Sequence, residues 1–257
     1  MCRHAAYLGP PIALNRFLAE PSHSLMVQSW RPREQITATV NADGFGFGWY
    51  LDDGRAGVYA NPMPIWSDPN LDHLGAALSS RLWIGNVRSA TRGQPVAQVN
   101  THPFLAGREL FSHNGFVHDF ANSLRGTLRR HLEPAFEAQI RGSTDSEYLF
   151  AALRQETAAG GGTAAALRRL FARLEAWLAG SHGLFNLLIA DGERIYATRH
   201  ALSHASPSLY VGGDAELFDG GWLVASEPLT GGGGWQEVPD HHLVVIEAGR
   251  EPRLEPL

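Results

Sequence analysis

The sequence contains no lysine, and all 21 of its basic residues are arginine. The absence of lysine excludes enzymes that bind a carbonyl substrate or pyridoxal phosphate through a lysine amine. It also excludes a phosphate-binding loop of the type that ends in Gly-Lys-Ser or Gly-Lys-Thr. Covalent catalysis in this chain would therefore depend on a different nucleophile.

Cysteine is nearly absent as well, since Cys2 is the only one among 257 residues. A single thiol excludes an internal disulfide and any zinc or iron–sulfur site built from several cysteines. The 12 histidines include no H-E-x-x-H or similar ligand spacing. We therefore expect no metal and no other cofactor, and we interpret His102 and the pair His241–His242 as structural residues.

Long apolar runs and basic blocks are missing too. No stretch approaches the ~20 apolar residues of a membrane-spanning helix, and polar residues such as Arg3 and Asn15 interrupt the apolar region that a signal peptide needs. The formal net charge of −5 gives no electrostatic footprint for nucleic acid. We therefore expect a cytoplasmic protein that acts on a small molecule, without nucleic acid or membrane partners, and leave a homo-oligomer open.

The apolar pattern predicts helices and strands without a regular strand–helix–strand rhythm. Asp53-Gly54 predicts a hairpin turn within residues 44–60, and short strands dominate from residue 184 onward. A strand is also expected over 83–91, and helices over 12–20, 72–82, 119–132, 145–157 and 163–179. We interpret residues 1–257 as one α+β domain of two antiparallel sheets with helices packed outside them.

The segment GNVRSATRG (85–93) places Arg88 at the end of an apolar strand. An arginine in such a place commonly faces solvent, and on its own this segment favours that interpretation. The guanidinium fork also matches a carboxylate through two parallel hydrogen bonds, and Thr91 can add a hydroxyl donor. Arg88 and Thr91 are therefore candidates for binding a substrate carboxylate.

The segment FSHNGFV (111–117) contains Asn114-Gly115. Asn-Gly is the commonest two-residue hairpin turn, so a turn is the simplest interpretation. Alternatively, the Asn114 side-chain N–H and the Gly115 backbone N–H form an oxyanion hole for a tetrahedral intermediate. Losing one such donor typically costs ~10²–10³ in rate.

Acidic residues gather in GSTDSEYLF (142–150). Thr144 and Glu147 fit the S/T-x-x-E capping box that begins a helix, and Asp145 suits a helix N-terminus. Asp145 and Glu147 are also candidates for receiving an ammonium group together. The sequence leaves both interpretations open.

Cys2 directly follows the initiator methionine. If Met1 is removed, Cys2 carries both a thiol and an α-amine, that is, a nucleophile and a base in one residue. An arginine and an aspartate together match the head group of a free amino acid, and a thiol with an oxyanion hole matches an amide farther along the same molecule. This combination describes a γ-glutamyl group as substrate.

Six segments now stand in a fixed order: Cys2, VRSAT (87–91), HPF (102–104), SHNG (112–115), TDSE (144–147) and ASEPL (225–229). The ordered set resembles the class II glutamine amidotransferases, which are N-terminal nucleophile hydrolases. The resemblance implies a four-layer α/β/β/α sandwich and assigns the site residues as follows: Cys2 as nucleophile, Arg88 and Thr91 on the α-carboxylate, Asn114 and Gly115 in the oxyanion hole, and Asp145 on the α-ammonium.

The chain begins MCR, where many members of that superfamily begin Met-Cys-Gly, and arginine lacks the conformational freedom of glycine. It is most similar to the branch of stand-alone γ-glutamyl hydrolases that includes the hydrolases of γ-glutamyl-hercynylcysteine sulfoxide in ergothioneine biosynthesis. The stretches that carry this similarity are AYLGPP (6–11), HSLMVQSW (23–30), VNADGFGFGWY (40–50) and PIWSDPNL (64–71).

The function implied is hydrolysis of a γ-glutamyl amide through a thioester, with release of glutamate. The motifs run from residue 2 to about residue 229, which leaves no room for a domain that activates an ammonia acceptor. Three alternatives stay open at this point: a glutaminase subunit that supplies ammonia to a partner synthase, a γ-glutamyl dipeptidase of glutathione-type peptides, and an inactive binding module.

Overall fold

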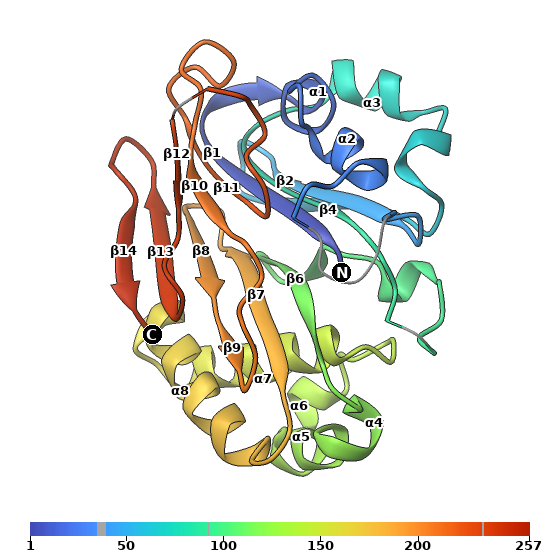
Figure 1. Cartoon of the computed structure of the whole chain (residues 1–257), viewed down its shortest axis with the longest axis vertical. Helices are drawn as coiled ribbons and strands as arrows, with labels where there is room; N and C mark the ends of the chain where they lie inside the picture. Colours follow the sequence, from blue (N-terminus) through green and yellow to red (C-terminus); the bar gives the residue numbers. More distant parts are fainter. Residues whose placement is uncertain (35–39, 92, 233) are drawn as a thin grey trace.

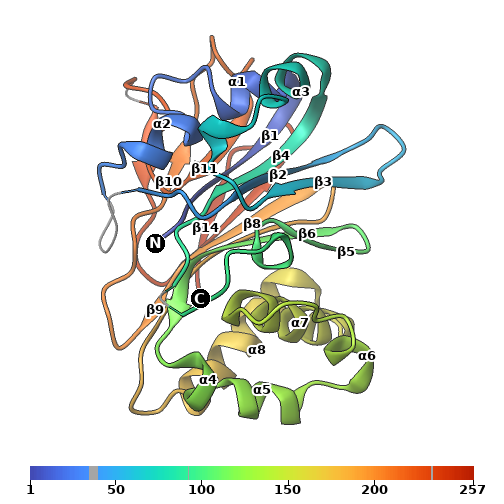
Figure 2. The same ribbon diagram turned by 90° about the vertical axis from the view of Figure 1, so that its right-hand side faces the viewer.

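A computed structural model describes residues 1–257 except 35–39, 92 and 233 (Figure 1). Two antiparallel sheets lie face to face, and helices cover the outer face of each, as Figure 2 shows edge-on. This arrangement confirms the predicted four-layer α/β/β/α sandwich. Among the described residues, no helix is long and apolar enough to cross a membrane.

The first sheet has β1 near its middle. Its strands, in spatial order, are β12 (Trp235–Glu237), β10 (Tyr210–Gly212), β11 (Trp222–Ala225), β1 (Arg3–Ala13), β4 (Ser79–Val87), β2 (Phe45–Tyr50) and β3 (Ala56–Asn61). The helices on its outer face are α1 (Leu14–Leu18), α2 (Leu25–Trp30) and α3 (Leu71–Ala77).

The second sheet has β7 and β6 near its middle. Its strands, in spatial order, are β14 (Arg253–Pro256), β13 (His242–Glu247), β8 (Arg194–Arg199), β7 (Gly183–Ala190), β6 (Glu109–Val117) and β5 (Phe104–Ala106), with β9 (Ala201–Leu202) also paired to β7. Its helices are α4 (Phe120–Ser123), α5 (Arg125–His131), α6 (Pro134–Glu137), α7 (Asp145–Ala158) and α8 (Gly162–Trp177).

Apolar side chains fill all three spaces between the layers. Ile84, Leu110 and Leu188 belong to the cluster between the sheets. Phe47 belongs to the cluster under α1–α3, and Leu170 to the cluster under α7 and α8. Each sheet is therefore buried on both faces at its centre, which removes the polar–apolar alternation of a half-exposed strand.

The glycines of GFGFGWY allow the two sheets to approach closely. A Cβ at Gly46 would lie 2.3 Å from the His102 carbonyl oxygen, and one at Gly48 would lie 2.8 Å from a Leu110 methyl group. Phe45 and Phe47 point the other way, into the helix-covered cluster. The strand thus carries glycine on the face toward the second sheet and aromatic residues on the opposite face.

Some predicted boundaries are wrong. The helix expected over 72–82 ends at Ala77, and β4 begins at Ser79, because residues 79–82 alternate between exposed and buried positions as a strand does. The strand 3–13 was not predicted. The segment 119–132 forms two short helices instead of one.

Candidate functional site

Cys2 immediately precedes β1, near the middle of the first sheet. Its side chain is buried, and Sγ lies 3.8 Å from the Ser89 carbonyl oxygen. Pairing of β1 with β4 sets Arg3 opposite Val87. The register therefore brings the N-terminal residues beside the end of β4, where Arg88 follows directly.

Arg88 is buried, with 3% of its surface exposed. Its guanidinium donates to the Asp43 carbonyl at 3.3 Å and to the Pro95 carbonyl at 3.4 and 3.5 Å. Burial lowers the pKa of Arg88, while electrostatic interactions with Cys2, Asp43 and Asp145 act in the opposite direction. The interpretation of Arg88 as a solvent-facing strand end is therefore wrong.

Two other residues lie near the end of β4. Asp43 accepts a hydrogen bond from the Ala90 backbone N–H at 2.8 Å, so its carboxylate fixes the loop that follows Arg88. Thr91 is exposed on that loop, and its carbonyl accepts from the Gln94 N–H. No motif in the sequence links Asp43 to the end of β4, so its contact with this loop is visible only in the structure.

Asn114 and Gly115 lie inside β6, so the hairpin-turn interpretation is wrong. They pair with Asn186 and Phe185 of β7. A Cβ at Gly115 would lie 2.0 Å from the Leu184 carbonyl oxygen, which excludes any side chain at this position. Both residues are therefore held within a central strand of the second sheet, and the side chain of Asn114 faces the first sheet, where it bonds Ser226.

Ser226 connects Asn114 to the strand that carries Cys2. Its Oγ accepts from Asn114 Nδ2 at 3.1 Å and from the His4 backbone N–H at 3.0 Å. Its own N–H donates to the His4 carbonyl at 2.9 Å. One hydroxyl thus fixes the position of the Asn114 amide relative to the backbone two residues beyond Cys2. Ser226 stood in the ASEPL segment, but the sequence assigned it no role.

Asp145 is the first residue of α7 and lies against the end of β6. Its Oδ2 accepts from the Val117 N–H and its Oδ1 from the Ser146 N–H, both at 2.8 Å. Thr144 caps the helix by accepting from the Glu147 N–H at 3.2 Å, as the capping box predicts. The side chain of Asp145 is thereby held in a fixed position.

Glu147 does not share a site with Asp145. Its carboxylate accepts from the backbone N–H groups of Arg141 at 2.7 Å and Gly142 at 2.6 Å. Its function in the structure is to hold this loop. The expectation that the two carboxylates receive an ammonium group together is therefore wrong, and Asp145 remains the candidate.

Arg3 and Glu227 form a buried ion pair at the N-terminus of β1. Arg3 NH1 lies 3.1 Å from Glu227 Oε1, and both side chains are essentially inaccessible. Arg3 Nε donates to the Cys2 carbonyl at 2.7 Å. Arg3 belongs to β1 and pairs with Val87 of β4, so its backbone is extended and this position does not require the conformational freedom of glycine.

Glu227 also accepts three other hydrogen bonds. The donors are His23 Nε2 at 2.6 Å and the backbone N–H groups of Arg33 at 2.9 Å and Glu34 at 3.1 Å. Burial alone would raise the pKa of Glu227, but these bonds together with the charge of Arg3 lower it to about 2. One carboxylate thus ties the segments on either side of α2 to the residue that follows Cys2.

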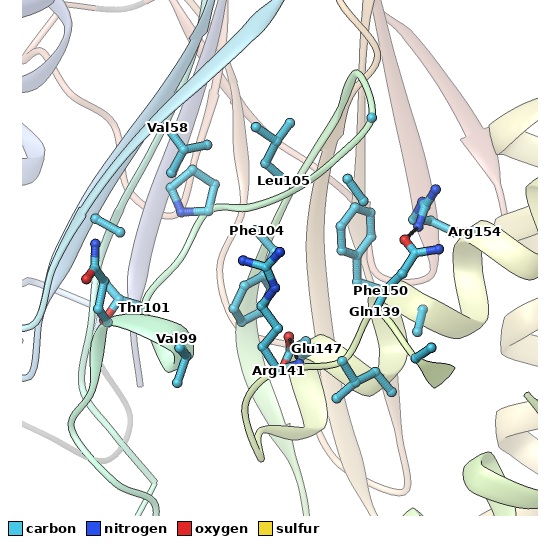
Figure 3. A pocket seen from close by; sticks show the side chains of 18 residues that line it. Val58, Val99, Thr101, Phe104, Leu105, Gln139, Arg141, Glu147, Phe150 and Arg154 are labelled. Carbon is cyan, nitrogen blue, oxygen red and sulfur yellow. Dashed lines mark hydrogen bonds between the residues drawn. The ribbon is translucent and has the colours of Figure 1, made fainter. Parts of the chain in front are cut away.

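A cavity of about 800 Å³ opens away from this site, between the β3–β5 edge and helices α6 and α7 (Figure 3). Arg141, Glu147 and Thr101 are among its lining residues, whereas Cys2 and Asn114 are not. Cys2 and Asn114 therefore lie outside this cavity.

The model of the class II glutamine amidotransferases matches residues 15–210. The chain belongs to the class II glutamine amidotransferases. It is therefore an enzyme of the γ-glutamyl hydrolase or amidotransferase type, as the ordered motifs indicated.

The similarity to individual members of the family extends over nearly the whole chain. The γ-glutamyl-hercynylcysteine sulfoxide hydrolase of Mycolicibacterium smegmatis is 33% identical over 246 residues, which are 96% of each chain. A solved glutamine aminotransferase class-II domain protein from Silicibacter pomeroyi is 29% identical, with a TM-score of 0.74 over 99% of each chain.

A more distant structure shares the fold alone. The glutamine phosphoribosylpyrophosphate amidotransferase of Bacillus subtilis is 15% identical, with a TM-score of 0.63 over 100% of this chain and 49% of that one. The sandwich of this class II amidotransferase thus corresponds to about half of the larger enzyme.

Proposed function

We propose that residues 1–257 form a single class II amidotransferase domain that hydrolyses γ-glutamyl-hercynylcysteine sulfoxide and releases glutamate. The observation that carries the proposal is the convergence of Cys2, Arg88, Asn114 and Asp145 from four separate segments on one end of the sandwich. The mycolicibacterial relative, named for this substrate and similar over nearly the full length, supports the choice of substrate.

The amino-acid head of the substrate is bound by Arg88 and Asp145. Arg88 offers a fork of N–H donors for the α-carboxylate, with Thr91 on the adjoining loop as a further donor. Asp145 is held by backbone N–H groups and offers its remaining lone pairs to the α-ammonium. The pair fixes the glutamyl group so that its γ-carbonyl points to Cys2.

Catalysis requires removal of Met1, which frees the α-amine of Cys2. The amine takes the thiol proton, directly or through a water molecule, and Sγ attacks the γ-carbonyl carbon. The Asn114 side-chain N–H and the Gly115 backbone N–H bind the oxyanion. The α-amine then gives the proton to the leaving nitrogen, the C–N bond breaks, and water hydrolyses the thioester to glutamate.

A comparison of three substrates tests the proposal. Glutamate release is measured with L-glutamine, with γ-glutamylcysteine and with γ-glutamyl-hercynylcysteine sulfoxide, using protein whose N-terminus has been determined by mass spectrometry. We expect kcat/KM to be highest for the sulfoxide. A preference for glutamine would favour a glutaminase subunit, and a preference for γ-glutamylcysteine would favour a γ-glutamyl dipeptidase.

A further inference from the structure

The strand pairing of the second sheet continues the site beyond Asn114. Asn114 lies opposite Asn186, and Phe116 lies opposite Leu184, which in turn lies opposite Ala201 of β9. Side chains two residues apart in a strand point to the same face. Phe116, Leu184 and Ala201, the apolar row, therefore lie on the same face as Asn114, which faces Ser226 of the first sheet.

Two residues farther along the same strands lie His118 and His182. The His118 N–H donates to the His182 carbonyl at 3.0 Å, and their rings stack with centroids 4.4 Å apart. His204, which follows β9, stacks on His182 at 5.9 Å, and Phe116 meets the His182 ring edge-on at 5.8 Å. His118, His182 and His204, the histidine row, thus continue the apolar row toward solvent.

The place of Met1 shows what the apolar row is positioned to bind. Met1 is 7% exposed, and its side chain packs with Leu184, Ala201 and Phe116. Met1 is bonded to the nitrogen of Cys2, which becomes the α-amine that must protonate the leaving group. Proton transfer requires this nitrogen and the leaving nitrogen to lie about 2.6–3.2 Å apart. The leaving group therefore has to occupy the space on this side of Cys2, which Met1 fills until it is removed.

We infer that the apolar row and the histidine row form the leaving-group subsite, and that the histidine row stacks on a flat imidazole carrying a quaternary ammonium group. The inference rests on the proposed function. His118, the first residue of the histidine row, lies four residues beyond Asn114, which is about 13 Å at ~3.3 Å per extended residue. Ammonia, the leaving group of glutamine, is too small to span this distance. An S-methyl group also stops short of it.

The electrostatics of the histidine row suit such a ligand. Burial, and to a smaller extent the neighbouring His118 and His204, lowers the pKa of His182, which favours the neutral form of its ring. A neutral aromatic ring attracts a cation through its π face, an interaction that recognises quaternary ammonium groups. His118 and His204 are exposed and leave the row open to solvent, from which a ligand can enter.

The test compares γ-glutamyl-hercynylcysteine sulfoxide with γ-glutamyl-S-methylcysteine sulfoxide, which lacks the imidazole and the ammonium group. For each variant, the ratio of kcat/KM for the first compound to kcat/KM for the second is measured. We expect His182→Ala to lower the ratio about 10-fold and His204→Ala to lower it about 3-fold, with His182→Phe restoring it by supplying an uncharged ring. His73→Ala, an exposed histidine on α3, serves as the matched control and leaves the ratio unchanged.

A ratio within twofold of the wild-type value in both alanine variants, or one that His182→Phe fails to restore, would overturn the subsite. Those results leave hydrolysis of γ-glutamyl compounds by the wild-type enzyme intact. Failure of the proposed function looks different, because wild-type enzyme would then release no glutamate from either compound, and the subsite would fall with it.

Discussion

Arg88 provides two properties that lysine cannot combine: a planar fork of donors and a charge held within a buried site. Arg88→Lys keeps the positive charge but removes the paired N–H groups that match a carboxylate. We expect KM for the γ-glutamyl substrate to rise 10-fold or more, with a smaller change in kcat, measured by steady-state glutamate release. Arg81→Lys, an exposed position on β4, is the control. An unchanged KM would remove Arg88 from substrate binding.

Glu227 makes folding stability depend on pH. Its pKa is lowered to about 2 from an ordinary value of 4.5, so its contribution is complete above pH 4.5 and disappears as the pH falls toward 2. The shift corresponds to a stabilisation on the order of 3 kcal/mol. Glu227→Gln should therefore lower the free energy of unfolding at pH 6, and the difference from wild type should be clearly smaller at pH 3.5.

Urea denaturation of both proteins at the two pH values measures this difference. Glu20→Gln, an exposed carboxylate outside the cluster, is the control and should match wild type at both. A difference between wild type and Glu227→Gln that stays constant from pH 6 to pH 3.5 would contradict the low pKa of Glu227.

At the scale of elements, the site depends on how β6 is placed against β1. Ser226 is the shared acceptor for the Asn114 side chain and the His4 backbone, so Ser226→Ala leaves two buried donors without this acceptor. The expected cost is about 1–3 kcal/mol of stability. Because the Asn114 amide is no longer fixed, we also expect kcat to fall at least 10-fold while KM changes little.

Steady-state kinetics and thermal unfolding of Ser226→Ala separate the two effects. Ser67→Ala, whose hydroxyl donates to the Pro64 backbone carbonyl at an exposed position, is the matched control. If kcat of Ser226→Ala equals that of wild type, the serine contributes to stability alone.

Elements with a clear local pattern were predicted well from the sequence, whereas the strand β1 was not predicted. The Asp53-Gly54 hairpin and the amphipathic helix α8 carry such patterns. By contrast, β1 has buried residues on both faces, includes the charged Arg3 and contains two prolines, so neither alternation nor a continuous apolar run marks it. The strand that directly follows Cys2 thus carries little local signal in the sequence.

At the scale of the whole molecule, the two sheets combine residues that are far apart in the sequence. Cys2, Arg88, Asn114 and Asp145 were identifiable from their order along the chain. Their partners Asp43, Ser226 and Glu227 were not, because their contacts join segments that are far apart in the sequence and carry no shared motif. Sequence analysis therefore found the candidate groups, whereas the structure shows what fixes their positions.

The packing of the two sheets also limits what can precede Cys2. The N-terminus lies at one edge of the sandwich, between the levels of the two sheets (Figure 2). A residue in front of Cys2 converts its α-amine into an amide, which cannot accept the thiol proton, and it fills the space beside Phe116 and Leu184. Activity should therefore depend on a free Cys2 even when the fold is complete.

A fusion with a protease site ending directly before Cys2, in place of Met1, tests this dependence. Before cleavage we expect native circular dichroism but less than about 1% of the glutamate release measured after cleavage, since nucleophile and base act together. The same fusion carrying Cys2→Ala should stay inactive after cleavage, which excludes a contaminating hydrolase. Full activity of the uncleaved fusion would show that catalysis does not use the α-amine of Cys2.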